Sequence, residues 1–157
     1  MLAVLATSAV AASPLPPDWR DVHAAVARYH SFQHAEQDGY TVAGEPCVSS
    51  PDGTMGIHAI NPVLMADATI DPLRPEILLY VPKANGKLKL VGVEYWMADA
   101  DGDLTTNEDR PSVLGQPADG PMPGHTTTMP VHYDLHVWLV AENPTGLFAP
   151  FNPAISC

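Results

Sequence analysis

The sequence predicts an α+β fold, in which one N-terminal helix packs on a curved antiparallel sheet of five or more strands. Such a sheet can close partly into a small barrel. Residues 18–37 carry a long amphipathic helical pattern, and short alternating apolar runs follow after Gly39. The 17 prolines favour short strands and ordered loops over long helices. A chain of 157 residues can build one hydrophobic core, so we expect a single globular domain over residues 18–157.

The helix prediction rests on spacing and on end signals. Pro17 and Asp18 suit a helix start, and Gly39 suits a helix stop. The apolar residues recur at three- and four-residue intervals and form one stripe: Trp19, Val22, Val26 and Tyr29.

Short apolar runs bounded by turn residues predict the strands. They cover residues 40–47, 55–60, 77–82, 87–97 and 131–141. Asn85-Gly86 is a strong two-residue hairpin signal, so the third and fourth strands should pair antiparallel. Residues 98–129, rich in Asp, Gly and Pro, predict a long loop that covers a site.

The N-terminal residues indicate export. Residues 1–13 resemble the end of a signal peptide, with an apolar run and the small-residue pattern Ala9-Val10-Ala11. The basic segment of such peptides is missing, so we expect a start codon upstream. The alternative is a short buried helix. Residues 14–17 then form a proline-rich spacer. We expect a secreted or periplasmic protein, or one of the cell envelope.

The charge balance excludes several partners. Seven basic residues stand against 18 acidic ones, which gives a formal net charge of −11. Nucleic acid and anionic membranes are bound through Lys and Arg, so neither is expected as a partner. No apolar run reaches the roughly 20 residues that a spanning helix needs, so we do not expect an integral membrane protein.

Cys47 and Cys157 are the two cysteines of the chain. An even count in an exported protein favours a disulfide bond. This bond would hold the C-terminal tail against the body of the protein. The alternative is a pair of free thiols, one of them a metal ligand.

Residues 130–140 combine a strand pattern with polar chemistry. If they form a strand, His132, Asp134 and His136 share one face, and the apolar residues between them share the other. Residues four apart on a regular strand are separated by about 13 Å, so both histidines reach one ion only through a bend near Tyr133 or Leu135. Otherwise one histidine is a ligand and the other belongs elsewhere.

Two neighbouring strands add polar groups. Glu94 stands in an apolar strand, where a carboxylate is costly unless it is paired or binds an ion. His58 lies on another strand, and His125 is near the end of the long loop. The predicted metal ligands are His58, Glu94, His125, His132 and His136. Asp134 is a further ligand or an orienting carboxylate. The alternatives are a hydrogen-bond network without metal and a set of unrelated positions.

This ligand set suits Zn, Cu, Fe or Mn as a divalent ion. The predicted function is an exported metal-binding protein, extended to a metalloenzyme that activates water or oxygen with Asp134 or Glu94 as acid or base. One alternative is a metal-free module that binds a small molecule in the same pocket. Another is a structural envelope protein.

A second ion site is suggested by Asp99, Asp101 and Asp103, whose alternating carboxylates resemble a calcium loop. Gly102 comes too early for an EF-hand, and Arg110 replaces the bidentate Glu. An acidic turn is the alternative.

Several segments together resemble a group of small exported bacterial proteins. They are Met55-Gly-Ile-His58 with Asn61-Pro62, Arg74 to Tyr80, Val91 to Trp96, Pro130 to Trp138, and Asn143 to Phe148 continuing to Cys157. The resemblance covers most of residues 29–157. It implies export and a shared fold, and it carries no activity with it.

Overall fold

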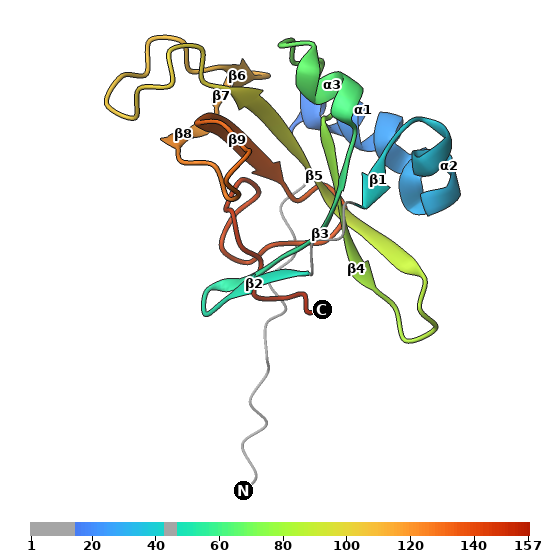
Figure 1. Ribbon diagram of the computed structural model, residues 1–157. Helices are drawn as coiled ribbons and strands as arrows, with labels where there is room; N and C mark the ends of the chain where they lie inside the picture. Colours follow the sequence, from blue (N-terminus) through green and yellow to red (C-terminus); the bar gives the residue numbers. More distant parts are fainter. Residues whose placement is uncertain (1–14, 43–46) are drawn as a thin grey trace, which may run out of the picture.

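The computed structural model describes residues 15–42 and 47–157. The signal-peptide-like segment predicted at residues 1–13 lies outside these ranges. The described chain is an α+β arrangement of N-terminal helices against an antiparallel sheet (Figure 1). The predicted fold class is therefore confirmed.

The N-terminal helix is shorter than predicted. The predicted helix over residues 18–37 is divided into α1 (Pro17–Val26), the 3-10 turn η1 (Ala27–His30) and α2 (Phe32–Gln37). Tyr80 donates a hydrogen bond of 2.7 Å from its hydroxyl to the carbonyl of Tyr29, at the level of the break. This hydrogen bond anchors η1 to the sheet. No helix in the described ranges is long and apolar enough to cross a membrane.

Seven strands of the described chain form the main sheet. These are β1 (Thr41–Val42), β2 (Val48–Ser50), β3 (Gly53–Ile60), β4 (Ile77–Pro82), β5 (Leu88–Ala98), β8 (Asp119–Met122) and β9 (His132–Val137). The order is β1-β3-β4-β5-β9-β8, with β2 also paired to β3, and every pairing is antiparallel. Because β1 and β8 do not pair, the sheet is open, and the predicted partial barrel is not supported.

The predicted strands match the structure best where the pattern was most apolar. The runs at residues 77–82 and 87–97 correspond to β4 and β5, which pair antiparallel around the predicted Asn85-Gly86 turn. The first predicted strand, residues 40–47, contains only the short β1 in its described part, and residues 43–46 lie outside the description.

One helix was missed. Residues after Asn61 form α3 (Pro62–Ala66), where the sequence pattern indicated only the end of a strand. The Asn61 side chain accepts hydrogen bonds from the backbone nitrogens of Val63 and Leu64, at 3.1 and 3.3 Å. Asn as N-cap followed by Pro at the first helical position is a recognisable start signal.

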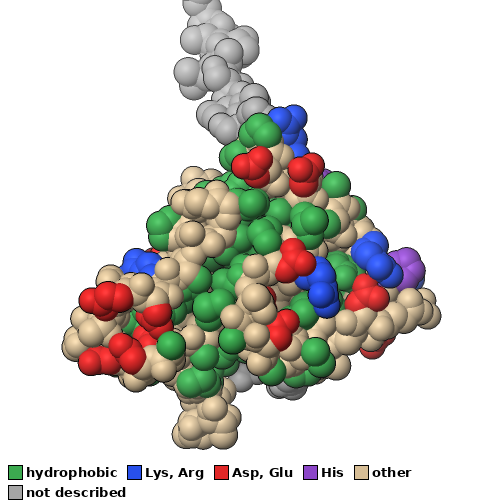
Figure 2. All heavy atoms as spheres, turned by 90° about the horizontal axis from the view of Figure 1, so that it is seen from above, with side chains coloured by type: hydrophobic (Ala, Val, Ile, Leu, Met, Phe, Trp, Pro, Cys, Tyr) green, Lys and Arg blue, Asp and Glu red, His purple; other side chains and the backbone are tan. Residues whose placement is uncertain are grey.

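The long segment after β5 is an irregular cover with short strands. It contains the small hairpin β6 (Ser112–Val113) and β7 (Gln116–Pro117), and then β8. Seen from above, acidic side chains gather on the side where this segment projects beyond the sheet (Figure 2). The segment therefore carries a visible part of the negative charge of the protein.

The sheet separates two apolar clusters. Alternate residues of β5 and β9, such as Val93 and Leu135, face the helices and pack with Trp19 of α1. The opposite face carries a second cluster that includes Trp96 and Trp138. This alternation is the one predicted for residues 130–140, and it leaves the polar residues of β9 on the face away from the helices.

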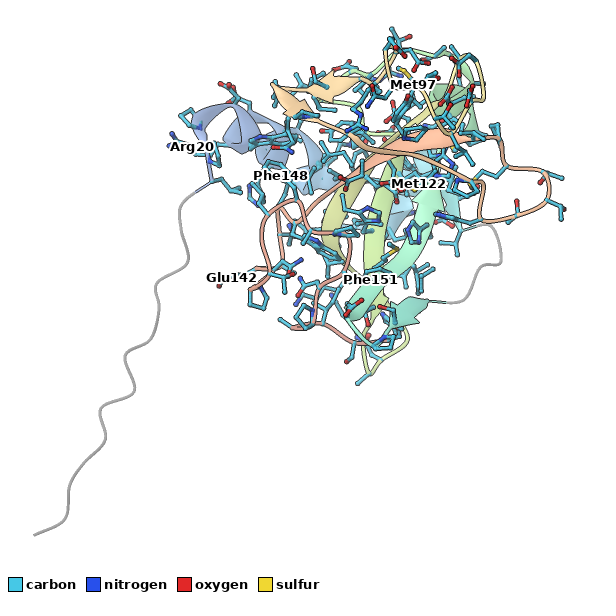
Figure 3. The ribbon with its side chains drawn as sticks, turned by 90° about the vertical axis from the view of Figure 1, so that its left-hand side faces the viewer. Arg20, Met97, Met122, Glu142, Phe148 and Phe151 are labelled. Carbon is cyan, nitrogen blue, oxygen red and sulfur yellow. A yellow bond between two sulfur atoms is a disulfide. The ribbon has the colours of Figure 1, made fainter. Side chains whose placement is uncertain are left out.

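The C-terminal tail contributes to both faces of the sheet. Phe148 packs on Trp19 with ring centroids 5.4 Å apart, whereas Phe151 lies beside the strands on the other face (Figure 3). Asn152 holds the tail to β3, because its backbone nitrogen and oxygen both pair with Thr54, at 3.0 and 3.1 Å.

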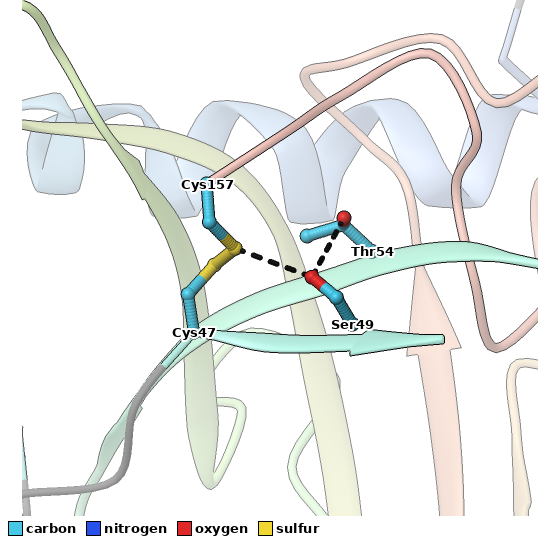
Figure 4. The surroundings of a disulfide bond; sticks show 4 residues. All are labelled: Cys47, Ser49, Thr54 and Cys157. Carbon is cyan, nitrogen blue, oxygen red and sulfur yellow. Dashed lines mark hydrogen bonds between the residues drawn. A yellow bond between two sulfur atoms is a disulfide. The ribbon is translucent and has the colours of Figure 1, made fainter. Parts of the chain in front are cut away.

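The predicted disulfide between Cys47 and Cys157 is present, with Cα atoms 5.9 Å apart (Figure 4). Ser49 Oγ lies 3.5 Å from Cys157 Sγ and 3.1 Å from Thr54 Oγ1. The bond therefore ties the last residue of the chain to the start of β2.

Replacing both cysteines by serine should destabilise the protein. The bond closes a loop with a sequence separation of 110 residues, which predicts a loss of about 4–5 kcal/mol in the loop-entropy model. Urea unfolding of the double variant, compared with the wild-type protein before and after reduction, measures the loss. A change below about 1 kcal/mol would mean that the Asn152 contacts hold the tail without the bond.

Candidate metal centre

Three strands each place one ligand-type side chain on the face away from the helices. His58 comes from β3, Glu94 from β5 and His136 from β9. Glu94 and His136 stand directly opposite each other in the β5–β9 pairing. His58 stands opposite Leu79 of β4, so its side chain reaches past that strand to meet Glu94. The sheet thus converges three side chains that are far apart in the sequence.

A glycine fits the crowded backbone beside Glu94. A Cβ atom built on Gly92 would lie 2.7 Å from the carbonyl oxygen of Val137 and 3.4 Å from the Trp138 ring. The first distance is too short for a Cβ atom, so glycine lets the end of β9 lie close against β5.

The distances among the three side chains fit a single ion. Glu94 Oε2 lies 3.1 Å from His58 Nε2 and 3.5 Å from His136 Nε2. One ligand atom from each residue lies within 4.8 Å of the others. Ligands bound to an ion at about 2.0–2.2 Å in tetrahedral geometry stand roughly 3.3–3.6 Å apart. The group could therefore hold a metal ion with little movement.

His136 is buried without a hydrogen-bond partner. Its side chain is 2% exposed, and neither ring nitrogen has a hydrogen-bond partner in the described chain. A buried polar group left in this state costs about 1–3 kcal/mol. A metal ion between His136, Glu94 and His58 would satisfy Nε2 and remove much of this cost.

The protonation states favour metal ligation. Burial lowers the pKa of His136, so its ring is neutral at neutral pH and has a lone pair to offer. Burial raises the pKa of Glu94, and a proton on His136 or His58 lowers it below its ordinary value, so the carboxylate needs a positive charge beside it. A metal ion would supply that charge in place of the proton. Neutral imidazole and ionised carboxylate are the forms that bind metal ions.

His132 lies outside this three-residue group. β9 pairs with β5 from His132 to Val137 without a register shift, so no bulge in this pairing brings both histidines to one ion. The His132 ring instead stacks on Trp96, with centroids 5.6 Å apart and an interplanar angle of 26°. Its Nδ1 lies 3.1 Å from the Pro130 carbonyl oxygen.

The other two predicted residues lie around the group. Asp134 Oδ1 is 3.8 Å from His136 Nδ1, beyond hydrogen-bond distance. Burial and the charges of Glu94 and Asp119 raise the pKa of Asp134 to about 8, so it is mostly protonated at neutral pH. His125 is exposed on the segment before β9, and its ring contacts His132 edge-on at 5.2 Å.

The predicted calcium ligands do not converge. Asp99, Asp101 and Asp103 each accept hydrogen bonds from nearby backbone nitrogens, so their oxygens cap consecutive turns. In the part of the chain that the structure describes, the group close enough to hold one ion is His58, Glu94 and His136. The geometry supports the acidic-turn alternative, and calcium binding here stays a sequence prediction.

A cavity of about 480 Å³ opens beside His58 and Glu94. Its size is within the usual range for small-molecule sites. Residues from five strands, from the segment before β9 and from the tail line it: Val48, Met55, His58, Ile60, Ile77, Glu94, Trp96, His125, Thr126, Met129, His132 and Phe151. The sequence patterns contain no signal that places Met55, Met129 or Phe151 at this cavity. Asp134 does not line the cavity.

Fold and site together define an α+β protein with a two-histidine, one-glutamate group at the edge of an apolar cavity. Comparison with known proteins adds no relative: no protein-family model, curated protein or solved structure matches the chain. What the site does must therefore be argued from its own chemistry.

Glu76 is a second buried carboxyl near the site. It is 1% exposed, and its Oε2 accepts a hydrogen bond of 3.2 Å from the backbone nitrogen of Trp96. Burial raises the pKa of Glu76 to about 7. Glu76 therefore fixes the backbone of Trp96, which lines the cavity. It keeps its proton at mildly acidic pH.

The raised pKa of Glu76 predicts that the free energy of unfolding falls as the pH rises from about 4.5 to 7. Below about pH 4.5 both states are protonated, and between pH 4.5 and 7 the unfolded chain ionises while folded Glu76 keeps its proton. Folding then becomes less favourable by on the order of 2–3 kcal/mol. In Glu76→Gln this part of the pH dependence should disappear, as measured by urea unfolding between pH 4 and 8. The exposed Glu36→Gln is the control, and equal pH profiles for the two variants would contradict the assignment.

Proposed function

We propose that the protein binds one divalent transition-metal ion through His58, Glu94 and His136. The observation that carries the proposal is the pair of buried His136 nitrogens without hydrogen-bond partners, next to a buried carboxylate. Two imidazoles and one carboxylate suit Zn, Fe, Cu or Mn. Three protein ligands leave coordination positions open, and His58 and Glu94 both border the cavity, so the open positions would face it.

Open positions beside a cavity are the arrangement of a catalytic metal site rather than a closed structural one. The proposed activity is therefore activation of water or oxygen at the ion. Glu94 cannot easily act as a free base while it ligates, because its lone pairs are then engaged. Asp134 does not line the cavity, and its Oδ1 lies 3.8 Å from His136 Nδ1, too far for a hydrogen bond, so it is not placed to act as an acid or base in the cavity.

We further propose that the protein works outside the cytoplasm. The Cys47–Cys157 bond supports this, because disulfides persist in oxidising compartments and are rare in the cytosol. The formal charge of −11 is compatible with an exported protein that attracts cations.

A metal-free binding module is the second candidate. His58 Nε2 and Glu94 Oε2 lie 3.1 Å apart, so the two side chains attract each other without an ion when His58 is protonated. The cavity beside it would then hold a small organic molecule. The unpartnered His136 nitrogens weigh against this candidate, since a network without metal leaves them unsatisfied.

Metal analysis tests the proposal. Untagged protein produced with supplements of Zn, Fe, Mn and Cu should contain about one equivalent of a single metal. The variants His58→Ala and His136→Ala should lose it, and a chelator should lower the melting temperature of the wild-type protein only. A content below about a tenth of an equivalent under every supplement, with a chelator-independent melting curve, would favour the metal-free module.

The matched control is His132→Ala, because His132 lies on the same strand and face as His136 but outside the three-residue group. It should keep about one equivalent of metal. Asp134→Asn should also keep about one equivalent of metal, because Asp134 makes no hydrogen bond to the His136 ring. If His132→Ala removes the metal and His136→Ala does not, the ligand set is wrong. Circular dichroism establishes that each variant is folded.

A further inference from the structure

The cavity beside the proposed metal centre is mostly apolar and has few charged groups. Most of its walls are apolar side chains, including Ile60 and Ile77 from the sheet. Of the described residues that line it, none is Lys or Arg, and Glu94 is the one carboxylate. Carboxylates, phosphates and sulfates are recognised by basic side chains. The walls therefore offer an organic anion no basic partner, and Glu94 repels it, so the proposed metal ion would be the one group of these walls that attracts it.

The walls offer flat and polarisable surfaces. Trp96 and His132 form a stacked pair, and Phe151 reaches the cavity from the tail. Met55 and Met129 supply thioether sulfurs. Aromatic rings favour such neighbours over a purely aliphatic wall, because ring–ring and sulfur–ring contacts add to apolar burial.

Polar groups border the cavity unevenly. His58 and Glu94 belong to the three-residue group, and their strands form the floor. His125 and Thr126 are exposed and come from the segment before β9, so they mark the entrance. A molecule bound between floor and entrance would place one polar atom at the floor and apolar surface against the walls.

We propose that this cavity binds a neutral aromatic molecule that carries one ligating oxygen, a phenol in chemical class. The ring lies among Trp96, Met129 and Phe151, and the hydroxyl oxygen points to the open side of the metal centre. The proposal rests on the proposed metal site for its polar end. The apolar walls supply the selectivity for an uncharged ring.

The probes are four compounds of similar size: p-cresol, toluene, p-toluate and 4-methylcyclohexanol. Calorimetric titration of the zinc-loaded protein should give the highest affinity for p-cresol. Loss of the oxygen in toluene, and replacement of the hydroxyl by a carboxylate in p-toluate, should each weaken binding by about tenfold or more. The saturated ring of 4-methylcyclohexanol should bind severalfold more weakly than p-cresol. Removal of zinc should weaken p-cresol more than toluene.

Two variants locate the binding site. Met129→Trp and Thr126→Trp add bulk inside or at the mouth of the cavity and should lower p-cresol affinity by about tenfold or more while metal content stays the same. Thr126 is exposed, so that variant keeps the test valid if Met129→Trp does not fold. Leu104→Trp adds a ring at another exposed position, outside the cavity, and should bind p-cresol like the wild type.

The outcomes separate the two proposals. Zinc binding together with p-toluate at least as tight as p-cresol, or with unchanged affinity in both cavity variants, overturns the phenol site and leaves the metal centre standing. Absence of zinc binding overturns the metal centre. If p-cresol and toluene then bind that protein with equal affinity, the phenol oxygen makes no specific contact and the phenol site is overturned as well.

Discussion

The buried carboxylate of Glu94 is the constraint on which the rest of the structure depends. A carboxylate in the middle of an apolar strand is strongly unfavourable unless opposite charge or ligands surround it. The sheet order places β9 beside β5 and β3 two strands away, so imidazoles approach from both sides, at 3.1 and 3.5 Å. The buried atoms of the described cluster that lack a hydrogen-bond partner are Glu94 Oε2 and both nitrogens of His136. An ion bound to Glu94 Oε2 and His136 Nε2 would satisfy two of these atoms at once.

One face of the sheet carries most of the apolar core, and the other face carries the candidate site. The helices cover one face with a continuous apolar core that includes Trp19, Tyr95 and Leu135. The other face has only a small apolar cluster, so space remains there for a cavity. The tail, fixed by Asn152 and by the disulfide, supplies Phe151 as a wall of that cavity. The covalent bond therefore shapes the site as well as stabilising the fold.

The alternation of residues 130–140, the hairpin at Asn85-Gly86 and the disulfide could be predicted, because each depends on local pattern or on cysteine count. The break in the N-terminal helix could not, since it involves Tyr80, 51 residues away from Tyr29. The convergence of His58, Glu94 and His136 was within the candidate set, but the choice of His136 over His132 depends on strand register. Register is a tertiary property that no spacing within one strand reveals.

That register is itself explained by charge. In the observed pairing, Glu94 faces His136 and Trp96 faces Asp134. A shift of two residues, which keeps the same face buried, would set Glu94 against Asp134 or against Trp138. The first arrangement places two carboxyls together in a buried site, and the second leaves Glu94 without one of its imidazoles. The observed register is the one of the three that pairs the buried carboxylate with a histidine, and it also brings Trp96 and His132 together as a cavity wall.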